Sequence, residues 1–187
     1  MTRNRDLDRR AQRTVIELVT ALDDDQLAAP TPCDGWSVRD VVEHLIGNNV
    51  WIVTGLGATA PVVADDPRVA YRTTADALTS TVADDEVLAK PFTLGEFGTF
   101  PAGIALGVHV VDVVVHGWDI ATSTGAEITV DDDLVSAAIE VVLSFPASAW
   151  GPGGAFARRI ELPADAPAMD RLLGLCGRDP AAGGPLG

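Results

Sequence analysis

Three residues with the chemistry of metal ligands stand close together in the apolar segment "GVHVVDVVVHGWDIATSTG". They are Asp112, His116 four residues after it and His109 three residues before it. On a helix that turns about 100° per residue, His116 lies about 40° from Asp112 and about 20° from His109, so all three share one face. The third histidine of the chain, His44, occurs in the segment "RDVVEHLIG". The pattern has two interpretations, a polar pair in the core and one half of a metal site.

The residues alone leave both interpretations open. An acid and a histidine four residues apart on one helix more often form a hydrogen-bonded pair than a metal site. A carboxylate among so many valines is nevertheless costly unless a cation or a metal accompanies it. A helical bundle can bring His44 from a second helix to the same place. Two histidines and one carboxylate would leave coordination positions open for water or substrate, as in catalytic zinc sites.

Helical periodicity predicts the elements that would carry these residues. Apolar residues recur at helical spacing from about residue 6 to 22, and Ser37 with Asp40 predicts the start of a second helix. Pro67 suits the first turn of a third helix over 66–85. The segment from about 102 is too long for an ordinary strand and ends at Gly125, so we expect a buried helix there. Residues 90–103 mix proline, glycine and aromatic residues, which suits a loop or a short hairpin.

The remaining segments predict two more helices near the C-terminus. Residues 131–145 are apolar at helical spacing and begin with three aspartates, which we expect to cap the helix rather than to bind calcium. A short closing helix is expected within 166–177. We therefore expect an all-α domain over residues 1–178, followed by a flexible tail over 179–187.

Composition narrows the possible partners and the location. An apolar content of 47% in 187 residues is enough for one core, and a net charge of −14 argues against nucleic-acid binding. The two cysteines are far apart, so we expect neither a disulfide framework nor a structural zinc module, and a reducing cytoplasm fits. We find no secretory signal at the N-terminus and expect no membrane-spanning segment, hence a soluble cytoplasmic protein.

Several other residues have an ordinary structural interpretation. Cys33 is more often a small buried residue than a reactive thiol, because no activating base stands next to it in the sequence. Glu43 and Asp119 adjoin the candidate ligands and could orient a histidine, although a solvated surface role is commoner for such acids. The four tryptophans are expected to be packing residues, some of them lining a pocket. No motif of serine hydrolases, P-loop proteins or dinucleotide-binding folds is present.

Three segments in the same order resemble a known family. They are "TPCDGWSVRDVVEHLIG", "DVVVHGWDIATSTG" and "APAMDRLLGLCGRDP", and they are similar to the N-terminal metal-binding domain of mycothiol-dependent maleylpyruvate isomerase and its short relatives in the DinB-like superfamily. The resemblance covers nearly the whole chain. It implies a four-helix bundle with a long crossover connection, additional C-terminal helices and a divalent metal, often zinc. The ligands it implies are His44, Asp112 and His116, with Asp112 in place of the family's usual Glu, and this shorter acid leaves His109 as an alternative ligand.

The resemblance also implies a reaction. Short relatives look like metal-dependent thiol S-transferases, in which the metal activates a thiol such as mycothiol toward an electrophilic substrate. We expect this activity rather than isomerisation, because the isomerase uses a C-terminal domain that we do not expect here. Two alternatives stay open: a hydrolase in which the metal activates water, and a metal- or ligand-binding helical module without turnover. The expected partners are a small-molecule thiol, an electrophile and a second copy of the chain in a homodimer, with no nucleic acid and no membrane.

Overall fold

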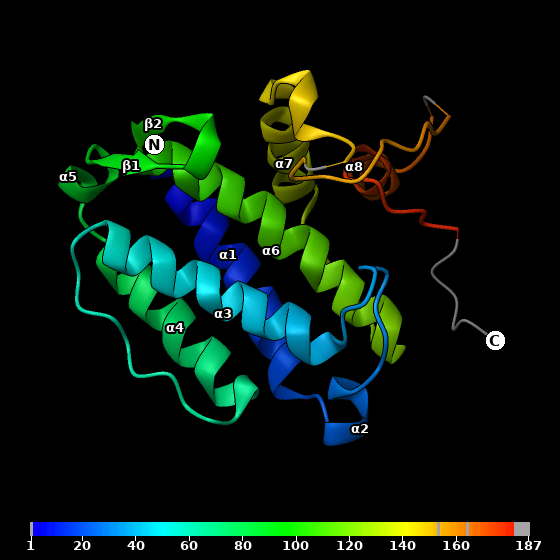
Figure 1. Cartoon of the computed structure of the whole chain (residues 1–187), viewed down its shortest axis with the longest axis horizontal. Helices are drawn as coiled ribbons and strands as arrows, with labels where there is room; N and C mark the ends of the chain where they lie inside the picture. The colour runs from blue at the N-terminus through cyan, green and yellow to red at the C-terminus, as the bar shows by residue number, and fades with distance from the viewer. Residues whose placement is uncertain (1, 153, 164, 182–187) are drawn as a thin grey trace.

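Four long helices enclose the main apolar core of the protein (Figure 1). The computed structural model describes residues 2–152, 154–163 and 165–181. The long helices are α1 (Thr2–Thr20), α3 (Val38–Gly55), α4 (Pro67–Thr81) and α6 (Ala102–Thr124). Helix α1 packs against α4 and α6, and α3 packs against the same two helices. This closed ring confirms the all-α fold. Residues 182–187 of the expected tail lie outside the described residues, so the tail and the domain boundary at 178 stay predictions.

The direction of the helices is the feature that defines the bundle. In Figure 1, α3 and α4 both run from the right-hand end to the left, whereas α1 and α6 run the other way. Residues 57–66 therefore return along the length of the bundle before α4 begins. This is the long crossover connection that the family resemblance implied, and it places α3 next to α6, which is where the candidate ligands lie.

Local chemistry sets the ends of these helices as expected. Ser37 and Asp40 form a capping box in which each side chain bonds the other residue's backbone N–H. Asp66 caps α4, and Pro67 occupies its first turn. Gly125 ends α6 with a φ of 68°, a left-handed conformation that glycine adopts without strain. These boundaries fix the positions along α3 and α6 at which polar side chains enter the bundle.

Short elements connect the helices. Helix α2 (Asp24–Leu27) precedes α3, and α5 (Asp85–Leu88) follows α4. Strands β1 (Pro91–Thr93) and β2 (Thr99–Pro101) then form an antiparallel hairpin in which Phe92 pairs with Phe100, with the single turn η1 (Gly95–Phe97) at its tip. The hairpin alternative for residues 90–103 is thus confirmed, and the hairpin leads directly into α6.

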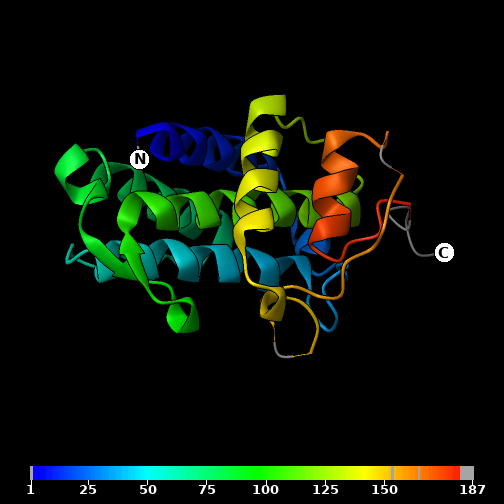
Figure 2. The same ribbon diagram turned by 90° about the horizontal axis from the view of Figure 1, so that it is seen from above.

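Two further helices lie across the bundle. Helix α7 (Asp132–Ser144) packs on α6, and α8 (Ala168–Leu175) packs on α7, with the turn η2 (Ala147–Ala149) between them. Figure 2 shows α7 and α8 standing crosswise to α6. The expected side-chain cap of α7 was wrong, because the Asp131 side chain makes no capping bond. Its carboxylate and that of Asp133 accept hydrogen bonds from Arg10 on α1 instead, since a guanidinium gives a charged partner that a backbone N–H does not.

Helix α6 corrects another expectation. It is long and apolar enough to cross a membrane by length and composition, whereas we expected no such segment. Of its most apolar 18-residue window, 78% is buried inside the protein. Helices α1, α3 and α7 all pack against it, so α6 is the central helix of the core.

Candidate functional site

His44, Asp112 and His116 meet between α3 and α6. The ring nitrogen Nε2 of His44 lies 3.2 Å from Asp112 Oδ1, and His116 Nε2 lies 3.4 Å from the same oxygen. The two imidazole centroids are 5.0 Å apart. One nitrogen or oxygen atom from each residue falls within 4.8 Å of the others. The structure thus brings the three residues expected to bind metal to one point.

The sequence of each helix explains this meeting. His44 stands about two turns after the Ser37 cap, on a helix whose neighbouring residues Val41 and Leu45 are buried. Asp112 and His116 are one turn apart on α6. Gly117 follows His116 where an added Cβ would lie 2.8 Å from Val15 Cγ2 of α1. The missing side chain therefore lets α6 approach α1 closely at the level of the site.

Asp119 holds the far side of the His116 ring. Its carboxylate, which is fully buried, accepts a hydrogen bond from His116 Nδ1 at 2.8 Å. Since a carboxylate accepts only, the proton of His116 belongs on Nδ1, and Nε2 faces Asp112 and His44. Burial lowers the pKa of His116, but the hydrogen bonds with Asp119 and Cys33 and the charge of Asp112 raise that pKa to about 10. Asp119 thus both orients the ring and increases its basicity.

Arg178 completes this arrangement from the C-terminal segment. Its Nη2 donates to Asp119 Oδ2 at 2.9 Å and its Nε to Oδ1 at 3.3 Å. Burial raises the pKa of Asp119, but His116 and Arg178 lower it by more, so its carboxylate stays ionised. Gly177, with a φ of 77°, turns the chain after α8 so that Arg178 points back to α6. Arg178 Nη2 also lies 3.2 Å from the sulfur of Cys33.

Asn48 and Trp36 surround the other two candidate ligands. The Asn48 amide donates to Asp112 Oδ2 at 2.9 Å and lies 3.0 Å from His44 Nε2. Burial raises the pKa of Asp112, but the hydrogen bond with His44 and the nearby histidine charges reverse this, and the net pKa lies well below its usual range. The Trp36 ring lies 5.3 Å from His44 and 6.2 Å from His116, measured between centroids. Asp112 is therefore a negative charge held in a half-enclosed setting.

A cavity of about 250 Å³ opens over these residues. Its lining includes the three candidate ligands, and also Cys33, Trp36, Val111, Val115, Ala155, Phe156 and Arg178. Two imidazoles and one carboxylate at the base of a cavity can bind a divalent metal and leave room for a further ligand. The same groups without a metal would form a polar cluster with no evident nucleophile except Cys33.

His109 lies apart from the other three candidate ligands and pairs with Asp8. Its Nδ1 lies 2.5 Å from Asp8 Oδ1 on α1, and it is not among the described groups of residues close enough to share an ion. Its Nε2 is buried and makes no hydrogen bond to the described residues. Although His109 and His116 share a helical face, seven residues separate them by about 10 Å along the axis. The rise of the helix therefore places His109 beside α1 rather than with His44.

The structure agrees with the expectation for Glu43 and differs from those for Asp119 and Cys33. Glu43 is exposed and pairs only loosely with Arg39, whereas Asp119 has the orienting role that we considered less common. Cys33 lines the cavity, in contact with Asp119 at 3.4 Å. Asn48 and Arg178 were not singled out at all. Asn48 follows His44 by four residues, a spacing that could have indicated it, but Arg178 is 59 residues from Asp119 and gave no local signal.

The sequence of the chain is similar to a known domain family and to mycobacterial proteins. Residues 9–87, which include His44 but end before α6, match the model of the mycothiol maleylpyruvate isomerase N-terminal domain. The chain is 30% identical over 178 residues to Uncharacterized protein MT0763 of Mycobacterium tuberculosis (strain CDC 1551 / Oshkosh), covering 90% of this chain and 94% of that protein. The same figures hold for Uncharacterized protein Rv0738 of strain ATCC 25618 / H37Rv. No solved structure is a significant match. The chain belongs to the mycothiol maleylpyruvate isomerase N-terminal domain family.

Proposed function

We propose that the protein is a metal-dependent thiol S-transferase that uses a mycothiol-type thiol and a divalent metal, most simply zinc. The observation that carries this proposal is the convergence of His44, Asp112 and His116 from two helices at the base of a cavity. The family's link to mycothiol supplies the thiol. A small-molecule thiol and an electrophile are the two partners that the reaction requires.

The donor set fits a divalent metal. Two imidazole nitrogens and one carboxylate oxygen are the protein ligands of several open catalytic zinc sites, in which a further position accepts water or substrate. The contact from His116 Nδ1 to Asp119 also matches the carboxylate–histidine pairs that orient metal-binding imidazoles. Bound at His44, Asp112 and His116, the metal would lower the pKa of a thiol so that a thiolate is available at neutral pH.

The protein's own residues prepare the site for this chemistry. Asp119 holds the Nδ1 proton of His116, so that Nε2 is the ring nitrogen that faces the cavity and would bind a metal once its proton has left. Arg178 keeps Asp119 ionised and in place, and Asn48 holds Asp112 through an amide hydrogen bond. Trp36 and Phe156 give the cavity an apolar part of its wall. In the reaction the thiol sulfur forms a bond to an electrophilic carbon, the leaving group departs with the electron pair of the broken bond, and the thiol proton passes to solvent.

Metal content gives the first test. Protein purified without chelator should contain about one metal ion per chain, and His44→Ala should lose it. Glu43→Ala, which removes an exposed side chain from the same helix, is the matched control and should retain the metal. His109→Leu should also retain it, because His109 bonds to Asp8. Equal metal content in all four proteins would refute the proposed ligands.

Activity gives the second test. The metal-loaded protein is incubated with mycothiol and 1-chloro-2,4-dinitrobenzene, and the products are identified by mass spectrometry. We expect the thioether conjugate and chloride, formed faster than in the absence of protein, and no such increase with His44→Ala. A protein that cleaves a mycothiol conjugate but forms none would instead be a hydrolase.

A further inference from the structure

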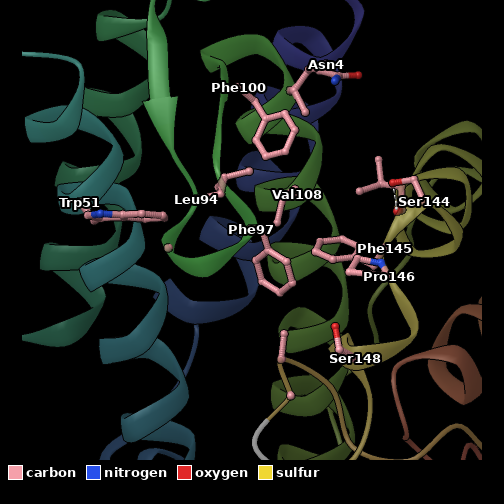
Figure 3. A pocket seen from close by; sticks show the side chains of 15 residues that line it. Asn4, Trp51, Leu94, Phe97, Phe100, Val108, Ser144, Phe145, Pro146 and Ser148 are labelled. Carbon is pink, nitrogen blue, oxygen red and sulfur yellow. Dashed lines mark hydrogen bonds between the residues drawn. The ribbon is translucent and has the colours of Figure 1, made fainter.

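A second and larger cavity lies beside the candidate metal site. Its volume is about 890 Å³, within the range of pockets that hold drug-sized molecules. Figure 3 shows Trp51 of α3 on one side, and Phe97 and Phe145 close together on the other, with Val108 of α6 above Phe97 in this view. Phe97 and Phe145 pack edge to face with centroids 5.2 Å apart. The hairpin, α3, α6 and the segment after α7 all contribute to its wall.

The described residues that line this large cavity are mostly apolar, and none of them is charged. None of the 15 described residues that line it is acidic, basic or a histidine. Asn4, Ser144 and Ser148 are its polar residues, and Asn4 already donates its amide to Gly103 O at 2.8 Å. A carboxylate or phosphate placed here would lose its hydration without gaining a cation. The lining therefore favours a neutral molecule that is largely apolar.

Helix α6 connects the large cavity to the metal site. Ile104 and Val108 line the cavity, and Asp112 and His116 follow at the same four-residue interval. Residues four apart form a row that winds gradually around the helix, and each lies about 6 Å further along the helix axis than the one before. One stripe of α6 thus passes from apolar wall to candidate ligands.

Two other segments of the chain also line both cavities. On α3, Trp51 lines the large cavity, and His44, seven residues earlier, lines the smaller one. After α7, Ala155 lines both cavities. Phe145 of the large cavity also packs edge to face against Phe156 of the smaller one, at 5.6 Å between centroids. The two cavities therefore adjoin along three separate segments of the chain.

We propose that the large cavity binds the second substrate, and that this substrate is a neutral, mainly apolar electrophile rather than an organic acid. The assignment as a substrate site rests on the proposed function, but the binding preference follows from the lining alone. The apolar body of the electrophile would lie between Trp51 and Phe97, with its reactive carbon directed along α6 toward Asp112 and His116. The thiol would then occupy the smaller cavity.

Binding to the full chain after removal of metal with a chelator tests this proposal without any turnover. Calorimetry compares 2-acetylnaphthalene, which is neutral, with 2-naphthoate, which has the same ring system and a carboxylate. We expect the ketone to bind at least about tenfold more tightly, because the carboxylate finds no cation in the cavity. Similar affinities for the two compounds, or no binding of the ketone, would overturn the proposal.

Matched variants locate the binding. Ile104→Glu places a charge on the cavity wall at a side chain that is 45% exposed, so that folding is preserved, and should weaken ketone binding about tenfold. Val69→Glu makes the same change on α4, at a side chain that is 52% exposed and outside the cavity, and should have no effect. Phe97→Ala, at the half-exposed cavity rim, should weaken binding about fivefold. Equal effects of Ile104→Glu and Val69→Glu would refute the location.

The two proposals fail separately. If ketone binding depends on Ile104 and Phe97 but the protein forms no conjugate with any thiol, the cavity is supported as a binding site and the transferase proposal is refuted. If the protein conjugates the thiol but Ile104→Glu leaves the KM for 1-chloro-2,4-dinitrobenzene unchanged, the transferase proposal stands. The large cavity is then refuted as the binding site of the electrophile.

Discussion

The buried pair of Asp8 on α1 and His109 on α6 tests how the bundle is stabilised around the site. His109 Nδ1 lies 2.5 Å from Asp8 Oδ1, and the two side chains are 3% and 2% exposed. Asp8→Ala removes the acceptor and leaves the imidazole buried without it. Loss of one partner of a buried pair costs about 3–5 kcal/mol, out of a total of about 5–15 kcal/mol for a typical domain. We therefore expect a decrease of that size in the free energy of unfolding.

The effect should depend on pH in a defined direction. Burial lowers the pKa of His109, but the charge of Asp8, its hydrogen bond and the charge of Asp112 raise it by more, so the net pKa is raised. Folding then favours the protonated form. The stabilisation is complete below the unfolded-state pKa of about 6.5 and is lost as the pH rises through the higher folded-state pKa. The difference between the native protein and Asp8→Ala should be largest near pH 6 and smaller at higher pH.

Urea denaturation followed by circular dichroism measures both effects. Asp8→Ala, His109→Leu and the double variant complete a cycle in which the double variant should cost about 1–3 kcal/mol less than the sum of the single ones. Asp6→Ala removes an exposed carboxylate paired with Arg9 on the same helix and should cost no more than about 1 kcal/mol. A loss below about 1 kcal/mol for Asp8→Ala, or a loss independent of pH, would refute the reasoning.

Two further predictions concern α6. Asp119→Asn removes the charge that orients His116 and should weaken zinc binding about 10- to 100-fold. Competition with a chromophoric chelator measures this affinity. An unchanged affinity would show that the contact is not needed to hold the metal. Gly117→Ala places a Cβ 2.8 Å from Val15 Cγ2 and should lower the free energy of unfolding by about 1–3 kcal/mol. Its control is Gly47→Ala on α3, where nothing lies within 4 Å and a gain of about 0.5–1 kcal/mol is expected.

Local signals in the sequence predicted ends of three of the long helices because each signal acts within about one turn, whereas the short helices α2 and α5 were not predicted. Ser37 with Asp40, Asp66 with Pro67, and Gly125 act on backbone groups a few residues away, and the structure has helix ends at all three places. The aspartates before α7 show the limit of such signals. The carboxylates of Asp131 and Asp133 bond to Arg10, and the expected cap is absent at Asp131. Arg10 is more than 120 residues away in sequence and comes close to them only after folding.

The site was predictable to the extent that it lies on one helix. Asp112 and His116 share a face by spacing alone, but the choice of His44 as their partner needed the family resemblance. The spacing could not separate His109 from the site, because angular position on a helix carries no information about axial distance. Asp8 stands among charged residues in "RDLDRRA", which would suggest an exposed position, yet it is fully buried and pairs with His109. Arg178 likewise reaches Asp119 only through the packing of α8.

The large cavity has no signature in the sequence, because its walls come from elements spread from Asn4 to Ala155. Its lining nevertheless bears on the proposal that the substrate is a neutral electrophile rather than an organic acid. Maleylpyruvate carries carboxylates, and none of the described residues that line the large cavity offers a cation to pair with one. Arg178, in the smaller cavity, already has its Nε and Nη2 on Asp119. A dianionic acid would therefore lose hydration on entering the large cavity without compensation. On the proposed function, the lining of the large cavity therefore favours an electrophile other than this acid.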